Sequence, residues 1–266
     1  MIGQGTWNLE RGDERAAVAA LEAGIEAGMT HLDTAEMYGS GRAERLVARV
    51  LAGRRERLFL VSKVLPSNAS YERTLTACER TLERLGTDYL DVYLLHWRGK
   101  VPLEETFRAF EVLESAGKIR AFGVSNFDVG DLEESVAIAG EGRIACNQVL
   151  YNLAERSIEH SVIPWCRAHG VAVVAYSPFG SGDFPPLDHG GGKALAAVAQ
   201  GRGITPHQAA LAFLVQKGEA FTIPKAASAA HAVENAAAGG LVLSEEELRD
   251  IDAAFPAKRR RRLAMI

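Results

Sequence analysis

The sequence has few of the features that place a protein in a membrane or in an oxidising compartment. Its longest apolar runs have the length of a strand, far below the roughly 20 residues that a helix needs to cross a bilayer. The first ten residues, MIGQGTWNLE, contain neither a basic start nor an apolar core, so we expect no secretory signal. The three cysteines, Cys78, Cys146 and Cys166, form no C-x-x-C pair, which favours a reduced, cytoplasmic setting.

A large excess of one charge is also missing. The 266 residues include 30 Lys and Arg against 34 Asp and Glu, a net charge of −4, so we expect neither nucleic acid nor an anionic membrane as partner. The basic block AKRRRR at 257–262 is expected to be a solvated C-terminal segment. Only His31 and His96 lie near predicted strand ends, and neither has a partner at metal-ligand spacing, so no metal site is predicted.

Short β-rich runs alternate with longer amphipathic segments along the whole chain. The predicted strands are 2–6, 31–33, 58–63, 90–96, 119–125, 144–149, 171–176 and 220–224. The clearest predicted helices are 15–28, 71–86 and 103–117, and each ends at a glycine. Eight strand-and-helix units in 266 residues favour a closed (β/α)8 TIM barrel, an α/β fold with a single domain over residues 1–266. An open dinucleotide-binding sheet is disfavoured because GQGTWN lacks the third glycine of G-x-G-x-x-G.

Chemically active side chains follow successive predicted strands. Asp33 ends the second strand and leads to Tyr38, Lys63 ends the third, and His96 ends the fourth. Taken singly, each has an ordinary structural explanation: a helix cap, a loop aromatic, a surface lysine or a core histidine. Catalytic groups of such barrels collect at the carboxyl ends of the strands. The four residues are therefore predicted to meet on one rim.

Such a group would overcome the weakness of tyrosine as an acid. A free phenol has a pKa of about 10. We expect Lys63 to lower the pKa of Tyr38, Asp33 to hold the ammonium group, and His96 to orient a carbonyl oxygen and share its proton. This set predicts a general acid that protonates a carbonyl as it becomes an alkoxide.

With these four residues in their local sequences, DTAEMYG, VSKV and YLLHW, the chain resembles the aldo-keto reductase family nearly end to end. The family's catalytic tetrad falls on Asp33, Tyr38, Lys63 and His96. The segments GVSNF, NQVLYN, AYSPFG and TIPKAASAAHAVEN resemble its cofactor-binding segments. The cofactor-binding residues that the resemblance implies are Gly5, Thr6, Trp7, Asp33, Ser125, Asn126, Gln148, Tyr176, Ser177, Pro178, Phe179, Gly180, Ser181, Ile223, Pro224, Lys225, Ala226, His231, Glu234 and Asn235. The implied substrate pocket contains Trp7, Tyr38, His96 and Trp97.

Roles within this set also follow from the resemblance. Ser125, Asn126 and Gln148 would hold the nicotinamide carboxamide, and Tyr176 would stack on the ring. The loop 177–192 would run over the pyrophosphate. Near the adenosine, Lys225 would contact the 2′-phosphate, with Glu234 and Asn235 close to the adenine.

Two departures from the family pattern affect the expectations. Ala226 and His231 stand where many members have a serine and an arginine that grip the phosphate. A permanently charged fork is lost, since histidine is mostly neutral at pH 7. NADP(H) is still expected to be preferred through Lys225, with NAD(H) used at lower efficiency. At the ends, the hairpin that plugs the barrel in the family is expected to be largely absent, and the short tail after Pro256 is expected to leave an open pocket.

The resemblance implies an NADPH-dependent oxidoreductase that reduces aldehydes and ketones to alcohols. The local motifs GQGTW and DTAEMY are most similar to those of bacterial members that reduce methylglyoxal and related small dicarbonyls. A small-molecule carbonyl is the expected partner, and we expect a monomer. The alternative is a cofactor-binding regulatory or redox-sensing subunit with little turnover, although no interaction repeat in the sequence favours it.

Overall fold

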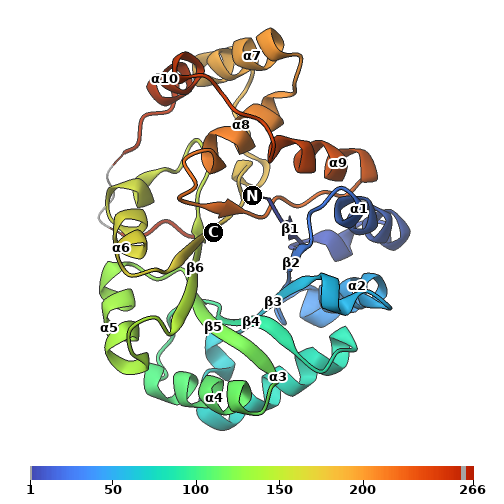
Figure 1. The fold of residues 1–266 in the computed structure, drawn as a ribbon, viewed down its shortest axis with the longest axis vertical. Helices are drawn as coiled ribbons and strands as arrows, with labels where there is room; N and C mark the ends of the chain where they lie inside the picture. Colours follow the sequence, from blue (N-terminus) through green and yellow to red (C-terminus); the bar gives the residue numbers. More distant parts are fainter. Residues whose placement is uncertain (1, 259–261) are drawn as a thin grey trace.

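The computed structural model describes residues 2–258 and 262–266. These residues form one parallel sheet of eight strands, ordered β1 to β8 along the chain, with each strand paired to the next. The strands are Gln4–Gly5, His31–Asp33, Phe59–Val64, Leu90–Leu95, Ile119–Ser125, Ile144–Leu150, Ala172–Tyr176 and Phe221–Thr222. The sheet curls on itself and helices surround it (Figure 1). The predicted (β/α)8 architecture is therefore confirmed.

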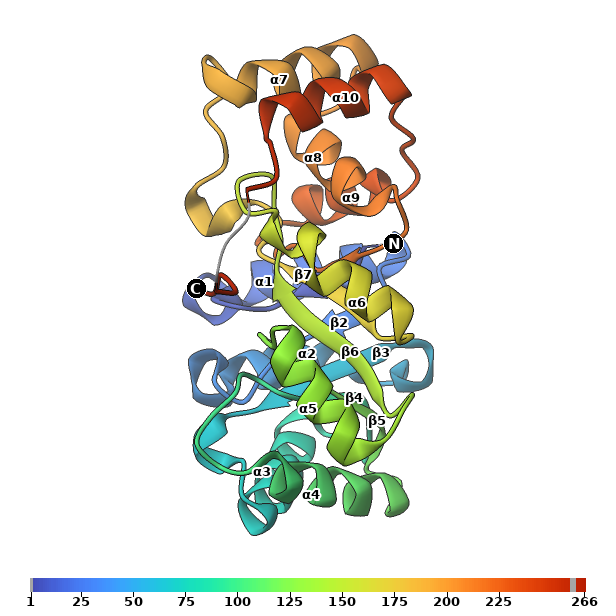
Figure 2. The same cartoon turned by 90° about the vertical axis from the view of Figure 1, so that its left-hand side faces the viewer.

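Helices follow the strands and pack on the outer face of the sheet. The α-helices α1 to α10 are Glu14–Glu26, Arg42–Leu51, Tyr71–Leu85, Leu103–Ser115, Val129–Ala139, Val162–Ala168, Gly190–Arg202, Pro206–Val215, Ala229–Ala238 and Glu245–Ala254. Helices α7 and α10 pack together beyond α8 at one end of the molecule, opposite the end formed by α3 and α4 (Figure 2). Among the described residues, no helix has the length and apolar character needed to span a membrane.

The helix α3 shows why these segments are helical. Its apolar residues recur every three or four positions, and of these Cys78, Leu82 and Leu85 are buried against the sheet. The helix stops at Gly86, whose φ of 63° is the left-handed conformation that a C-terminal cap requires. The predicted helices 15–28 and 103–117 likewise correspond to α1 and α4, each of which ends two residues before its glycine.

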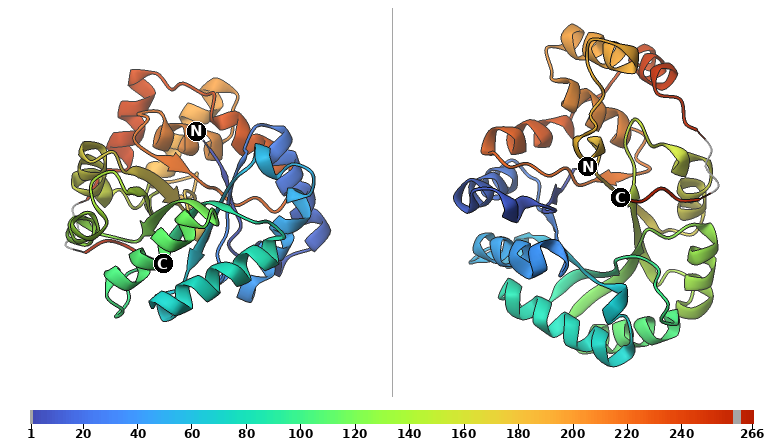
Figure 3. Two further views of the ribbon diagram at one scale, coloured as in Figure 1. Left: turned by 60° about the horizontal axis from the view of Figure 1, so that its bottom comes forward. Right: turned by 180° about the vertical axis from the view of Figure 1, so that it is seen from behind.

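The first and last strands meet at a narrow seam. β1 and β8 have two residues each, shorter than predicted. The Gly3 amide donates to the Thr222 carbonyl at 2.8 Å, and the Gly5 amide donates to the Pro224 carbonyl at 3.1 Å. In the view from behind, the C-terminus lies within the ring of strands and helices (Figure 3). The seam brings the N-terminal and C-terminal parts of the chain to the same rim.

The C-terminal segment crosses back over this rim. Arg156 holds the end of α10 through a salt bridge to Asp252 at 2.6 Å and a hydrogen bond to the Phe255 carbonyl at 2.5 Å. Three arginines of the predicted solvated block, residues 259–261, lie outside the described residues. Beyond them, Met265 and Ile266 line the cavity at the barrel mouth. The short tail therefore does reach the pocket, which the sequence pattern did not predict.

Candidate active site

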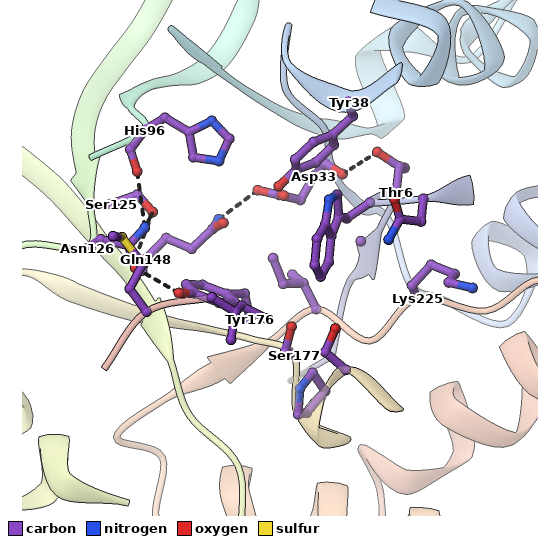
Figure 4. A pocket seen from close by; sticks show the side chains of 18 of the residues that line it. Thr6, Asp33, Tyr38, His96, Ser125, Asn126, Gln148, Tyr176, Ser177 and Lys225 are labelled. Carbon is purple, nitrogen blue, oxygen red and sulfur yellow. Dashed lines mark hydrogen bonds between the residues drawn. The ribbon is translucent and has the colours of Figure 1, made fainter. Parts of the chain in front are cut away.

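A cavity of about 420 Å³ opens at the carboxyl ends of the strands. Its walls include residues at or just beyond the ends of β1, β2, β4, β5, β6, β7 and β8, together with the C-terminal segment (Figure 4). The lining residues are Gly5, Thr6, Trp7, Asn8, Asp33, Met37, Tyr38, His96, Trp97, Ser125, Asn126, Gln148, Tyr176, Ser177, Pro178, Phe179, Ser181, Gly182, Ile223, Lys225, Met265 and Ile266. The parallel strands thus bring most of the predicted site residues into one cavity.

Lys63 lies directly behind this cavity and is fully buried. Its Nζ donates to Asp33 Oδ1 at 2.6 Å, to the Thr34 carbonyl at 2.8 Å and to the Tyr38 hydroxyl at 3.3 Å. The second oxygen of Asp33 accepts a hydrogen bond from Gln148 Nε2 at 2.7 Å. Asp33 therefore holds the ammonium group against the phenol, as predicted.

The acidity of Tyr38 differs from the expectation. Burial raises the pKa of Tyr38 above its usual value of 10.0, and the nearby charge of Lys63 only opposes that rise. Lys63 does lower the pKa of Tyr38, as predicted, but desolvation of the buried phenolate outweighs this one cation, so the net pKa lies above the usual value. For Lys63, burial alone would lower the pKa, but Asp33 and Tyr38 together raise it above 10.5. At neutral pH the site therefore holds a protonated phenol beside a charged lysine.

His96 lies at the cavity opposite the phenol. Its ring centroid is 5.7 Å from that of Tyr38 and 4.9 Å from that of Trp97. Burial, helped by the charge of Lys63, lowers the pKa of His96 to about 2. The imidazole is therefore neutral near pH 7: it can donate or accept a hydrogen bond, but it holds no extra proton to share.

A chain of amide and hydroxyl groups continues from His96 into the cavity. Asn126 Nδ2 donates to the His96 carbonyl at 3.1 Å, and Asn126 Oδ1 accepts from the Tyr176 hydroxyl at 2.8 Å. The Ser125 hydroxyl donates to the Gln148 carbonyl at 2.8 Å. Asn126 has a left-handed φ of 62°, a strained conformation that fixes where its amide points. These groups form a rigid polar wall beside the phenol.

The side chain of Gln148 meets this wall from β6. Its nitrogen is occupied by Asp33, while its oxygen accepts no hydrogen bond within the part of the chain that the structure describes. An amide oxygen that faces a cavity and has no partner fits the N–H group of a carboxamide.

The other end of the cavity carries positive charge. Lys225 is exposed and lies across the cavity from Asn126 (Figure 4). A dinucleotide has its carboxamide at one end and its phosphates toward the other. The acceptor oxygen of Gln148 at one end of the cavity and the cationic Lys225 at the other fit such a cofactor in that order. Among residues 2–258 and 262–266, no group of three or more His, Cys, Asp or Glu side chains could hold a metal ion.

Several predicted cofactor residues do not line the cavity. They are Gly180, Pro224, Ala226, His231, Glu234 and Asn235. His231 is exposed in the first turn of α9, and Asn235 is buried. The Glu234 carboxylate accepts a hydrogen bond from the Thr205 hydroxyl. Four of the six, Ala226, His231, Glu234 and Asn235, lie beyond Lys225 in the sequence. The roles of all six toward a cofactor stay predictions.

The sequence pattern missed other residues that line the cavity, namely Asn8, Met37, Gly182, Met265 and Ile266. Two of them could have been found from the sequence, because Asn8 follows Trp7 and Met37 precedes Tyr38, both predicted site residues. Asn8 also has a left-handed φ of 60°. Nothing in the sequence pattern indicated Met265 and Ile266, since their position depends on how the chain returns from α10.

The barrel and its cavity define an enzyme of the (β/α)8 class, and comparison with known proteins identifies the family. The model of the aldo/keto reductase family matches residues 1–255. The chain is 45% identical over 260 residues to a methylglyoxal reductase of Escherichia coli K12, covering 96% of this chain and 91% of that protein. It is 37% identical to a glyoxal reductase of Bacillus subtilis, with 95% and 87% covered.

Solved structures agree with this assignment. An aldo-keto reductase from Klebsiella pneumoniae in complex with NADPH superimposes with a TM-score of 0.94 at 45% identity, covering 100% of this chain and 94% of that one. A complex of an aldo/keto reductase from the same organism with NADP and acetate gives the same score, covering 100% of this chain and 95% of that one. The chain belongs to the aldo/keto reductase family. It is an NAD(P)H-dependent oxidoreductase, as the sequence predicted.

Proposed function

We propose that this protein reduces aldehydes and ketones to alcohols with NADPH, using Tyr38 as the general acid. The observation that carries the proposal is the Tyr38 hydroxyl, which is held 3.3 Å from the Nζ of a fully buried lysine beside the cavity. The bound nicotinamide would supply the hydride. The chain's own residues then have to bind the cofactor, orient the carbonyl and deliver a proton.

Proton delivery follows from the charges around Tyr38. Its pKa is raised by burial, so the hydroxyl carries its proton at neutral pH and can donate it to a developing alkoxide. The phenolate that remains would lie against the Lys63 ammonium, which Asp33 holds at 2.6 Å. Neutral His96 would orient the substrate oxygen through a hydrogen bond, without giving up a proton.

The cavity walls favour small, uncharged carbonyl compounds. Around the phenol the lining is apolar: Trp7, Met37, Trp97, Met265 and Ile266. Among the described residues, none that lines this side of the cavity is a lysine or an arginine, so within that part of the chain a carboxylate or phosphate on the substrate would find no cationic partner. Similarity to reductases named for methylglyoxal and glyoxal supports small dicarbonyls such as methylglyoxal within this class.

For the cofactor we propose NADPH over NADH. Lys225 is a cation exposed at the end of the cavity away from the phenol, and the relatives solved with NADPH and NADP support a phosphorylated cofactor here. Because Ala226 and His231 replace a serine and an arginine, the preference should be moderate. We further propose that the chain acts as a monomeric, single-domain enzyme of the cytoplasm.

The test is NADPH oxidation with methylglyoxal by the parent protein and by Tyr38→Phe. Removing the hydroxyl should lower kcat by at least about 100-fold, the usual scale for a general acid. NADPH affinity, followed by fluorescence, should stay within about twofold, because the phenylalanine ring keeps the packing. Near-normal turnover in Tyr38→Phe would rule out this role, and absence of turnover in the parent with a broad panel of aldehydes would favour a regulatory subunit.

A further inference from the structure

The turn that carries Tyr38 has a strained backbone. It is the short helix η2, Tyr38–Gly41, and its last three residues all have left-handed φ values. Ser40 has a side chain and is therefore strained in this conformation, which persists only where the surrounding structure fixes it. Helix α2 follows at once, and its N-cap, Gly41, provides no side-chain hydrogen bond. The turn therefore needs contacts from other elements to keep its shape.

One such contact comes from Arg84 on α3. A Cβ on Gly41 would lie 2.5 Å from Cδ and 2.6 Å from Nε of Arg84. The arginine side chain therefore lies directly against the Gly41 backbone, in space that the side chain of any other residue would enter. Helices α2 and α3 are neighbours outside the sheet and pack against each other (Figure 1). Their packing keeps the arginine on the turn.

The same arginine belongs to a buried network that reaches β3. The Arg84 guanidinium forms an ion pair with Glu44, which is fully buried in the first turn of α2. Glu44 Oε1 accepts a hydrogen bond from the Ser62 hydroxyl at 2.8 Å. Ser62 immediately precedes Lys63 on the strand. The network thus joins the turn η2 to the strand that carries the catalytic lysine.

The contact between Tyr38 and Lys63 is sensitive to the position of this turn. The Tyr38 hydroxyl lies 3.3 Å from Lys63 Nζ, just beyond the range of about 2.7–3.2 Å that is usual for N–H···O bonds. Within the described residues, that hydroxyl makes no second hydrogen bond. Lys63 itself is held by Asp33 at 2.6 Å. A small movement of η2 would therefore carry the phenol away from a cation that stays in place.

We propose that the Glu44–Arg84 ion pair positions Tyr38 for proton transfer, by holding η2 against β3 at the spacing that the contact between Tyr38 and Lys63 requires. This inference rests on the proposed function, because it takes Tyr38 as the general acid. Glu44 and Arg84 are positioning residues: neither lines the cavity, and both act through the phenol. Misplacing a catalytic group by 1 Å can lower a rate by about 100-fold.

The experiment compares Arg84→Ala with the parent in the reduction of methylglyoxal by NADPH, with the folded fraction checked by circular dichroism. The value of kcat should fall by about 10- to 100-fold. The Kd of NADPH should stay at the parental value, because every residue that lines the cavity is unchanged.

The pH dependence of kcat/KM gives a second readout, which a purely structural role would not produce. Burial and Asp33 raise the pKa of Tyr38, and Lys63 lowers it. A phenol that lies farther from Lys63 is therefore a weaker acid, and the alkaline limb of Arg84→Ala should move to higher pH. Partial unfolding at high pH would move the limb in the opposite direction.

Further variants test whether the effect passes through Tyr38. In a Tyr38→Phe background, Arg84→Ala should not lower the residual kcat further, because the group that it positions is already absent. Arg84→Lys keeps a cation for Glu44 and an aliphatic stem against Gly41, so it should recover most of the parental kcat. If Arg84→Ala does not fold, Ser62→Ala replaces it, since it breaks the link next to Lys63 and keeps the ion pair. It should lower kcat by about 2- to 10-fold, the scale of one hydrogen bond.

A second buried ion pair on the same strand provides a matched control. Arg55 pairs with Asp91 at 2.8 Å, and Asp91 Oδ2 also accepts a hydrogen bond from the Leu60 amide at 2.8 Å, near the start of β3. The side chains of Arg55 and Asp91 are 14% and 4% exposed, against 19% and 0% for Arg84 and Glu44. Arg55→Ala should lower the free energy of unfolding and leave kcat and the alkaline limb at their parental values.

Several results would overturn the inference. A parental kcat with an unmoved limb in folded Arg84→Ala, or a parental kcat in Ser62→Ala where it is needed, would show that the network does not position the phenol. An equal loss of kcat from Arg84→Ala with and without the Tyr38 hydroxyl would show that Arg84 acts elsewhere. A kcat in Arg84→Lys as low as in Arg84→Ala, or an equal loss in Arg55→Ala, would also contradict it. Near-normal turnover in Tyr38→Phe would instead overturn the proposed function, and the inference with it.

Discussion

At the scale of single residues, catalysis here depends on a balance around one buried phenol. Burial raises the pKa of Tyr38, and the attraction of Lys63 opposes this. The ammonium group is held by Asp33 at 2.6 Å and by the Thr34 carbonyl at 2.8 Å. Because the lysine cannot move away, its influence on the phenol is fixed by the fold and can be measured by removing it.

Lys63→Met should move the alkaline limb of the pH profile of kcat/KM to higher pH. The direction of this shift follows from the contact between Lys63 and Tyr38. Lys63 favours the phenolate and lowers the Tyr38 pKa, so the loss of Lys63 raises that pKa further. The rate itself should fall, because the phenolate formed in the reaction loses its cation. Steady-state rates across pH 6 to 10 measure both effects.

Lys225→Met is the control for that experiment. It removes a lysine that is exposed rather than buried and lies away from Tyr38. It should weaken NADPH binding and leave the alkaline limb in place. A reduced rate with an unmoved limb in Lys63→Met would mean that Lys63 acts in some other way.

At the scale of elements, the short helix η2, Tyr38–Gly41, decides where the phenol points. Three successive residues, Gly39, Ser40 and Gly41, have left-handed φ values of 55°, 54° and 85°. A Cβ on Gly39 would lie 2.4 Å from Cγ of Glu10, a buried residue of the short helix η1, Leu9–Arg11. The turn that aims Tyr38 therefore depends on residue 39 having no side chain.

Gly39→Ala should lower the free energy of unfolding more than Gly86→Ala does. Both glycines are left-handed, at 55° and 63°, so both variants carry the strain of about 1–2 kcal/mol that alanine meets there. Only position 39 adds a clash, of about 1–3 kcal/mol, since nothing lies within 4 Å of a Cβ on Gly86. Urea unfolding compares them. Adding Glu10→Ala should recover most of the excess; equal losses in the two single variants would contradict the clash.

A buried ion pair connects α2, β3 and α3. Glu44, fully buried, pairs with Arg84 and accepts a hydrogen bond from the Ser62 hydroxyl at 2.8 Å. Burial raises the pKa of Glu44 above its usual value, and Arg84 opposes that rise. A carboxyl group whose folded pKa is raised contributes stability at low pH that is lost as the pH rises through that pKa.

Arg84→Ala should therefore lower the free energy of unfolding by about 3 kcal/mol at pH 8, the cost of a buried charge left without its partner. Without the arginine the Glu44 pKa rises further, so the loss should shrink at pH 5.5 as the carboxylate takes up a proton. The double variant Glu44→Gln with Arg84→Ala removes the titrating group and should be equally stable at both pH values. An equal loss at pH 5.5 and pH 8 in Arg84→Ala would show that Glu44 is not the cause.

The sequence predicted the elements well because strand ends and capping glycines are local signals. Asp33, Lys63 and His96 could be assigned to one rim since parallel strands align their carboxyl ends. The pKa of Tyr38 could not be predicted, because it depends on how completely the surrounding elements exclude water. Nor could the stack of the Phe184 ring on that of His207, with centroids 4.0 Å apart, since it joins the loop after β7 to the start of α8, which the sequence pattern treats as separate.

At the scale of the whole molecule, the cavity gathers residues from both ends of the chain. Gly5 ends the first strand and Trp7 follows it, while Lys225 and Ile266 come from beyond the last strand. These parts meet at the β1–β8 seam, where the Gly3 amide donates to Thr222 at 2.8 Å. A dinucleotide bound across the cavity would therefore contact both sides of the seam. Cofactor binding should stabilise the entire barrel by mass action, about 2.7 kcal/mol at 100 times Kd.

Cofactor choice can be read from this stabilisation. At equal concentration NADPH should raise Tm more than NADH, since one charge-assisted contact from Lys225 corresponds to about 10- to 100-fold in affinity. His231→Arg should enlarge the NADPH shift and leave the NADH shift nearly unchanged, because only the phosphorylated ribose offers the guanidinium a partner. His231 is exposed in the first turn of α9, so the longer side chain fits without repacking. Thr76→Arg, at an exposed position of α3, controls for added charge. Equal changes in the two shifts for His231→Arg would mean that position 231 does not face the phosphate.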